Sequence, residues 1–181
     1  RTLLDELIQF GEYEKLDERI DCYLGTKDIN DFFRCVLRRF EEDYGRNLVR
    51  RILTYLFLSR NGLSESEILT LIKVRPLYWS QFYCAFSNHL TVKNGLITFS
   101  HQYVREVVEN IYMLDKEYVK VFRSRIVALF IDSRTSRAFD ELPYQYELLD
   151  DDDHLHHFLL DFEVFNYINK KDIYELGAYW R

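Results

Sequence analysis

Proline and glycine are scarce in this chain, which contains only two and six of them among 181 residues. This scarcity predicts long helices and few structured loops. No apolar run approaches the roughly 18 residues that a membrane-spanning helix needs, and no signal peptide is visible. We therefore expect a cytoplasmic protein with no membrane partner. The helical pattern at Arg1 and the abrupt end at Trp180-Arg181 indicate a piece of a longer protein.

Cysteine is rare as well, with Cys22, Cys35 and Cys84 as its only occurrences. The count is odd, and no C-x-x-C pair occurs. All three lie within apolar helical patterns, so we expect reduced cysteines of the core in a reducing compartment.

Positive charge is in deficit, because the formal net charge is -6 at pH 7. A protein surface that binds nucleic-acid phosphates needs an excess of Lys and Arg, so this net negative charge argues against nucleic acid as a partner. Hydrophobic residues make up 48% of the chain and aromatic residues 17%. The length allows one to two domains with a sizeable core.

Residues 62–112 contain the most informative pattern. Ser64 and Glu67 match a capping box at the start of one helix, and Pro76 lies in the first turn of the next. Asn94-Gly95, between the alternating segments 90–92 and 96–98, is a strong hairpin signal. Ser100 is then the expected cap of a last helix. Helix, helix, hairpin, helix is the order of a winged helix.

Helical periodicity continues on both sides of this region. Before it, helices are predicted over residues 3–10, 16–24, 29–40 and 48–59, the last apolar over much of its circumference. After it, a helix is predicted over residues 118–131.

The end of the chain has a different character. Short helices over 138–149, 154–160, 164–168 and 172–179 are separated by acidic or polar turns, which is typical of stacked helical hairpins. Such arrays generally need about three units, so this stack is too short to stand alone. The predicted fold class is thus mainly α: a winged-helix domain with a small β-hairpin wing, flanked by helical segments and C-terminal helical hairpins.

Catalytic signatures are absent from the sequence. It contains no G-x-S-x-G elbow, no Cys–His pairing that spacing supports, and no phosphate-binding glycine loop. We therefore expect no enzymatic activity from this chain alone and assign no catalytic residue.

Two histidine-containing segments are candidate sites. His101 lies at the start of a helix, where an imidazole and the free backbone N–H groups can bind an anion together. Alternatively, the ring forms a hydrogen bond with the cap of its own helix or with solvent. The run Asp150–Asp153 precedes His154, His156 and His157, which invites a metal-site interpretation. Acidic residues before a helix are equally what capping and the helix dipole favour, and we assign no metal ligand.

Nucleic-acid binding through the predicted winged helix is a further alternative. Base readout requires Arg, Lys, Asn or Gln side chains on the recognition helix. The candidate helix over residues 76–90 offers Gln81 and Asn88, and no Lys or Arg after Arg75.

Six segments, taken in order, resemble one region of NACHT-type STAND ATPases: LLDELIQFGEYEKLDERIDCYL, DINDFFRCVLRRFEEDYG, GLSESEIL, WSQFYCAF, NGLITFSHQYVREVVENIY and ELPYQYELLDDDDHLHHFLLDFEVF. The similarity is to the large, nephrocystin-like kind that carries TPR or WD40 repeats, and the region is the one after the nucleotide-binding core. The resemblance implies that residues 1–27 end a small helical domain, 28–114 form the winged-helix domain, and 115–181 begin a second helical domain or helical repeats.

Members of that family are nucleotide switches, in which ADP holds a closed monomer and ATP permits oligomerisation. They often place a winged-helix histidine, in an F-x-H-x-x-x-x-E setting, against the ADP β-phosphate, and Phe99, His101 and Glu106 match that pattern. The resemblance implies that His101 contacts ADP in the full-length parent only. This chain lacks the Walker lysine and the magnesium-binding acidic residues, so ADP or ATP with magnesium would be cofactors of the parent and not of the chain.

These observations leave three hypotheses for function. The chain is a regulatory fragment of a STAND ATPase, with an intramolecular nucleotide-binding domain as its partner and a homo-oligomeric parent. Alternatively, it is a helical scaffold that binds protein partners through the C-terminal hairpins without nucleotide. The third hypothesis is a winged-helix binder of nucleic acid.

Overall fold

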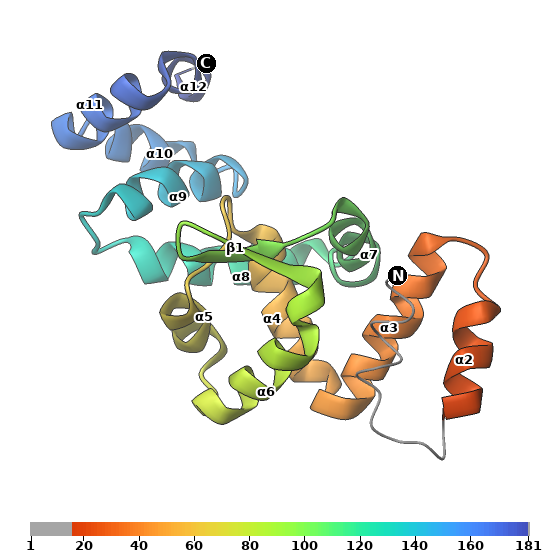
Figure 1. Cartoon of the computed structure of the whole chain (residues 1–181). Helices are drawn as coiled ribbons and strands as arrows, with labels where there is room; N and C mark the ends of the chain where they lie inside the picture. Colours follow the sequence, from red (N-terminus) through yellow and green to blue (C-terminus); the bar gives the residue numbers. More distant parts are fainter. Residues whose placement is uncertain (1–15, 181) are drawn as a thin grey trace. The chain divides into compact units, whose positions relative to one another are not determined.

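The computed structural model describes residues 16–180, which are mainly helical with one two-stranded sheet (Figure 1). They divide into two compact units. The first unit contains the described residues up to Phe57 together with Gly62–Leu114. The second unit contains Leu58–Asn61 and the described residues from Asp115 onward. None of the described helices is both long enough and apolar enough to cross a membrane.

The described part of the first unit contains six α-helices, a short 3-10 helix and a β-hairpin. In chain order they are α2 (Leu16–Leu24), α3 (Ile29–Tyr44), α4 (Arg46–Leu58), α5 (Glu65–Ile72), α6 (Pro76–Phe86), η2 (Ser87–His89), β1 (Leu90–Lys93), β2 (Leu96–Phe99) and α7 (Gln102–Tyr112). The helix predicted over residues 3–10 lies outside the described residues. The three-part division at 1–27, 28–114 and 115–181 stays a prediction.

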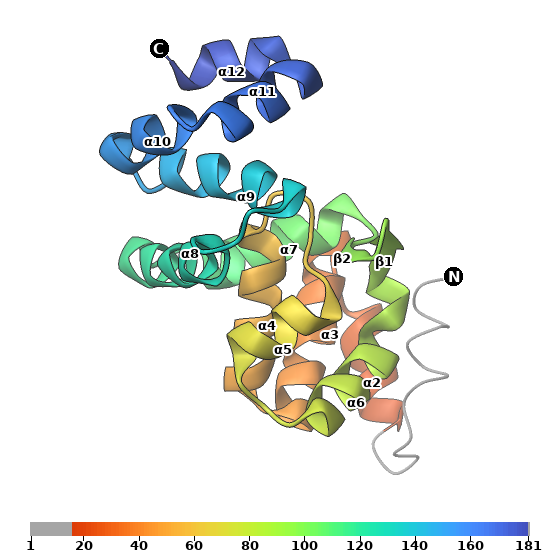
Figure 2. The same ribbon diagram turned by 90° about the vertical axis from the view of Figure 1, so that its left-hand side faces the viewer.

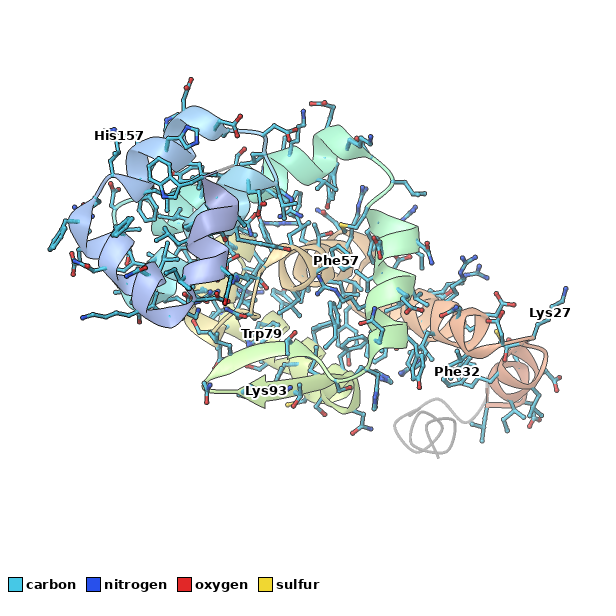
Figure 3. All side chains as sticks on the ribbon, turned by 90° about the horizontal axis from the view of Figure 1, so that it is seen from above. Lys27, Phe32, Phe57, Trp79, Lys93 and His157 are labelled. Atoms are coloured by element: carbon cyan, nitrogen blue, oxygen red, sulfur yellow. The ribbon has the colours of Figure 1, made fainter. Side chains whose placement is uncertain are left out.

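The core of the first unit forms around α4, as its apolar circumference predicts. Val49, Ile52 and Leu53 are completely buried. An aromatic cluster lies where α3 meets α6: the Phe40 ring is 4.8 Å from that of Phe86, edge to face. Such pairs stabilise a core beyond the area that they bury. Trp79 is almost fully buried and its indole N–H donates to Glu65. Figure 3 shows Trp79 among packed side chains, whereas Lys93 lies at the turn end of the hairpin.

Local signals in the sequence fix where the elements of this unit begin and turn. The predicted capping box is confirmed: Ser64 Oγ accepts from Glu67 N–H, and the Glu67 carboxylate accepts from Ser64 N–H at 2.8 Å. The predicted hairpin is confirmed too, since Leu90 pairs with Phe99 and Lys93 with Leu96 around the Asn94-Gly95 turn.

A third short segment joins the hairpin at Leu63. Its N–H and C=O both bond Ile97, at 3.0 and 2.8 Å, and form an isolated antiparallel bridge. The preceding Gly62 has a φ of 93° and approaches the Ile97 carbonyl closely. A sharp turn directly before the bridge therefore requires glycine at this position.

The start of α7 differs from the prediction by one residue. The helix begins at Gln102, so His101 and not Ser100 is its N-cap residue, and the His101 side chain makes no capping hydrogen bond. Ser100 instead donates from its N–H to His89 C=O and from its hydroxyl to Asn88 C=O. Ser100 does not cap α7 because its N–H and its hydroxyl are both hydrogen-bonded to carbonyl groups at the end of the 3-10 helix.

The expectation that all three cysteines lie in the core is wrong. Cys22 and Cys84 are exposed and Cys35 is half-buried. The apolar pattern around them is real, but it does not make each cysteine part of the buried face: on α6 the buried residues are Trp79, Phe82 and Phe86, and helical spacing puts the exposed Cys84 on the opposite side.

The second unit is built from successive short helices, which Figure 2 shows following one another in a zigzag (blue end of the bar). They are α8 (Lys116–Phe130), α9 (Ser136–Glu147), α10 (Asp152–Leu159), α11 (Phe162–Lys171) and α12 (Ile173–Tyr179). Each begins at an Asp or Thr whose side chain accepts from a backbone N–H of the first turn: Asp115, Thr135, Asp151, Asp161 and Asp172. The polar turns between these helices therefore supply the N-cap residue of each following helix.

Candidate functional site

The second unit contains a pocket between the start of α9 and one face of α11, with a volume of about 500 Å³. We call it the α9–α11 pocket. Its lining consists of Arg134, Ser136, Phe139, Phe162, Glu163, Asn166, Tyr167 and Lys170. The α11 residues share one side because they are spaced by three, four and seven positions.

Aromatic side chains form the apolar part of this pocket. Phe139 is 4% exposed, and its ring lies 5.6 Å from that of Tyr167, edge to face. Phe162, by contrast, is 80% exposed. Aromatic side chains are enriched in the cores of protein–protein interfaces relative to the rest of the surface.

Charged groups also line the α9–α11 pocket. Arg134 forms a 2.6 Å ion pair with Asp161, whose carboxylate also accepts from Glu163 N–H at the start of α11. The hydrogen bond from Arg134 lowers the pKa of Asp161, and the hydrogen bonds from the backbone N–H groups of Glu163 and Val164 lower it further. Asp161 therefore stays ionised at neutral pH and holds the arginine beside the aromatic floor. Lys170 adds a second positive group to the lining.

A buried polar network supports this unit from within. Glu141 and Gln145 of α9 are completely buried. Glu141 accepts from Arg60 N–H at 3.0 Å, from Gln145 at 2.7 Å and from Arg137 at 2.7 Å. Gln145 donates to the Leu58 carbonyl at 2.8 Å. The network binds the segment Leu58–Asn61 to α9 through a carboxylate with no water access.

The guanidinium of Arg60 extends the network to α12. It pairs with Glu175 and donates to the Asp140 carbonyl at 3.2 Å, while Tyr179 donates to Glu175 at 2.8 Å. The hydrogen bond with Arg60 lowers the pKa of Glu175 and raises that of Arg60. Both groups therefore stay charged at neutral pH and connect α12 to the segment 58–61.

Sequence reasoning missed this network, although a signal for it exists. Ala138, Leu142 and Tyr146 repeat at the spacing of one helical face, and Glu141 and Gln145 fall on that same face. Polar residues inside an apolar stripe indicate buried groups that need partners. The sequence cannot name those partners, because Leu58 and Arg60 lie some 80 positions away in the chain.

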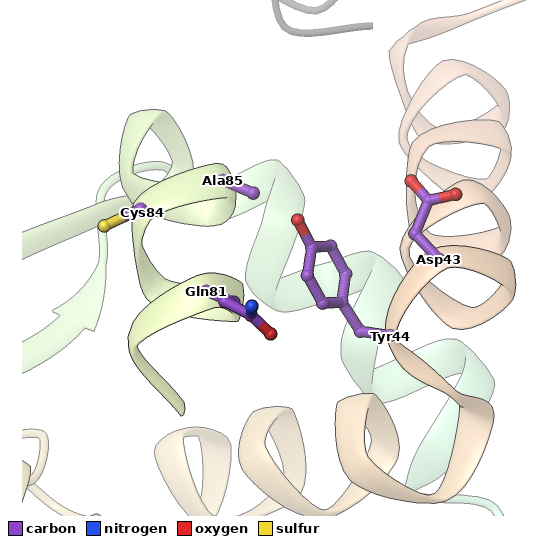
Figure 4. Close-up of a pocket in the computed structure, with 5 residues that line it drawn as sticks. All are labelled: Asp43, Tyr44, Gln81, Cys84 and Ala85. Atoms are coloured by element: carbon purple, nitrogen blue, oxygen red, sulfur yellow. The ribbon is translucent and has the colours of Figure 1, made fainter. Parts of the chain in front are cut away.

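The first unit contains a second pocket, of about 580 Å³, between α3 and α6. Figure 4 shows the Tyr44 ring projecting toward Gln81 and Ala85 on α6. Asp43 and Cys84 complete the lining, so the only charged side chain in it is acidic. Burial raises the pKa of the Tyr44 hydroxyl. This lining lacks the Lys or Arg that phosphate contacts need.

The structure places His101 at the surface of the first unit. Its imidazole is exposed, stacks at 6.2 Å on the ring of Tyr103 and makes no bond to its own helix. Of the two residues that share its motif, Phe99 is buried and Glu106 is half-buried. The ring is thus free to meet a group from outside this unit.

The acidic run before α10 has a structural role. Asp151 caps the helix through His154 N–H, and the His154 ring bonds the same carboxylate at 2.8 Å. His156 instead stacks on Trp180, with ring centroids 5.6 Å apart. His157 points outward in Figure 3. Within the described residues, no group of three His, Cys, Asp or Glu side chains is placed to hold a metal ion.

The chain is similar to proteins with tetratricopeptide (TPR) repeats. It is 28% identical to a TPR repeat-containing protein of Dictyostelium discoideum over 80% of the chain and 9% of that protein. It is 28% identical to mouse nephrocystin-3 over 94% of the chain and 14% of that protein. Rat tetratricopeptide repeat protein 41 is 24% identical over 70% of the chain and 13% of that protein. No protein-family model matches, and no solved structure is significantly similar.

Two conclusions follow from these similarities. The expected likeness to nephrocystin-like, TPR-containing proteins is confirmed. The chain spans less than a sixth of the length of the relatives given above, so the activity of a whole protein does not follow from it. The similarity that these comparisons support is to helical proteins of the TPR-repeat kind.

Proposed function

We propose that this chain is a helical scaffold module that binds another protein through its second unit. The α9–α11 pocket carries the proposal, because it combines a buried aromatic floor, the exposed Phe162 ring and two cationic side chains. Proteins built from TPR-type hairpins stack their helices into extended binding surfaces. The similarity to TPR-repeat proteins therefore supports the same use here.

The first test replaces Phe162 by serine. Removing a hot-spot ring is expected to cost about 2 kcal/mol of binding free energy, or roughly 30-fold in affinity. A photo-crosslinking amino acid placed at position 162 of the full-length parent identifies the partner, and its affinity for wild type and variant is then measured by calorimetry.

The matched control is Tyr174→Ser. Tyr174 is aromatic and 87% exposed, and it belongs to the same unit, but it does not line the pocket. Neither substitution is expected to change the thermal midpoint, because both rings are in water. Equal affinity of the Phe162 variant and wild type for the crosslinked partner would refute the proposal.

A second candidate function is the nucleotide-coupled one, and the exposed His101 ring favours it. In this proposal the first unit is a winged helix, as the order α5, α6, hairpin, α7 supports. The chain would then be the part of a NACHT-type STAND ATPase that relays the ADP or ATP state of a separate nucleotide-binding domain to opening and oligomerisation. His101 would contact the ADP phosphate, and magnesium would be bound by the parent's own core.

His101→Ala tests this second candidate in the full-length parent. A lost charge-assisted hydrogen bond is worth about 1.5–3 kcal/mol, so ADP affinity is expected to fall at least about tenfold. Calorimetry measures the affinity, and light scattering measures the mass, which is expected to increase. His157→Ala, an exposed histidine of the other unit, is the control. Unchanged ADP binding, or none by the wild-type parent, would leave only the scaffold function.

A further inference from the structure

Two of the three cysteines lie directly against each other in the first unit. Cys22 is on α2 and Cys35 on α3, and their Sγ atoms are 3.0 Å apart. Both are free thiols, and Cys22 is exposed. We propose that Cys22 and Cys35 are a modification site, at which a small-molecule disulfide converts the two thiols into a reversible cross-link between α2 and α3.

The geometry requires little movement for this bond. A disulfide has its sulfurs about 2.05 Å apart, so the two Sγ atoms have to approach by about 1 Å. The two helices are already packed beside the pair, since the Tyr23 and Phe32 rings are 5.1 Å apart. The cysteines are 13 positions apart in sequence, which means that the α2–α3 packing brings them together.

The two sulfurs differ in their surroundings, and this sets the order of reaction. Burial, followed by the contact with Cys22, raises the pKa of the Cys35 thiol to about 11. The thiolate is the nucleophile in disulfide exchange. The exposed Cys22 is therefore the sulfur that attacks first, and Cys35 is the resolving thiol.

The reaction balances with oxidised glutathione as the oxidant. Cys22 loses its proton, and its sulfur attacks the glutathione disulfide, forming a mixed disulfide and releasing one glutathione thiolate. Cys35 then loses its proton and attacks Cys22 Sγ, which breaks the mixed bond and releases the second thiolate. Two protein thiols are oxidised to one disulfide, and one glutathione disulfide is reduced to two thiols, which take up the two protons.

The test treats the 181-residue chain with oxidised glutathione, alkylates the remaining thiols and maps the products by mass spectrometry. The expected product contains the Cys22–Cys35 link with Cys84 outside it, and dithiothreitol reverses it. Ring closure in the folded chain is expected to be at least about tenfold faster than in urea, because the fold holds the reacting sulfurs together.

Two variants separate the steps. Cys35→Ser is expected to stop at a mixed disulfide on Cys22, whereas Cys84→Ser is expected to form the cross-link at the wild-type rate. The proposal is overturned by mixed disulfides alone in the wild-type chain, by links that involve Cys84 as often as Cys35, or by equal ring-closure rates in buffer and in urea.

Discussion

Replacing Glu141 by alanine is expected to lower the free energy of unfolding of the second unit by about 3–5 kcal/mol, the usual cost of removing one partner from a buried ion pair. Glu141 is completely buried and accepts hydrogen bonds from Arg60, Gln145 and Arg137. Without its carboxylate, the half-buried Arg137 guanidinium loses its ion pair and the Arg60 N–H loses its acceptor.

Hydrogen exchange measured by mass spectrometry along a urea series checks this, because peptides from α9 and α12 report on the second unit alone. Glu147→Ala is the control, since Glu147 is on the same helix and exposed. That substitution is expected to change stability by less than about 0.5 kcal/mol. If the Glu141 and Glu147 variants unfolded at the same urea concentration, the network would not be what holds this unit together.

Replacing Gly62 by alanine is expected to destabilise the first unit by about 3 kcal/mol. A left-handed backbone costs a residue with a Cβ about 1–2 kcal/mol, and Gly62 has a φ of 93°. The added Cβ would also lie 2.4 Å from the Ile97 carbonyl oxygen. That overlap displaces the two-bond bridge between Leu63 and Ile97, and each lost hydrogen bond costs about 1 kcal/mol.

The fluorescence of Trp79 follows this unit through urea unfolding, because its indole is 1% exposed. A Trp180→Phe background removes the only other tryptophan. Gly45→Ala is the matched control: its φ is 87°, but an added Cβ meets nothing within 4 Å. Gly45→Ala is therefore expected to lower the free energy of unfolding only by the cost of the left-handed backbone, about 1–2 kcal/mol. Equal losses for the two variants would mean that the contact with Ile97 contributes nothing.

Much of the secondary structure could be predicted because its signals are local. The capping box of Ser64 and Glu67 and the Asn94-Gly95 turn both act over two to three residues. The one-residue error at His101 has a non-local cause, since Ser100 is bonded to residues 88 and 89 of the preceding 3-10 helix.

The candidate site was less predictable than the helices that carry it. The sequence indicated stacked hairpins over residues 138–179 and protein partners for them. It did not indicate that Arg134, at the start of one hairpin, is held beside Phe139 by Asp161 of another helix. Pocket residues come from the packing of α9 against α11, and periodicity within one helix contains no information about its neighbour.

The sequence by itself determined the elements of this protein: where helices begin, where the hairpin turns and which faces are apolar. Those properties follow from dihedral preferences and from hydrogen bonds between near neighbours in the chain. Only the tertiary structure decided which polar side chains lost their water and which sulfurs came into contact. Glu141 is buried, and Cys22 lies against Cys35 instead of in the core, because distant helices pack there. Burial and proximity depend on the whole fold.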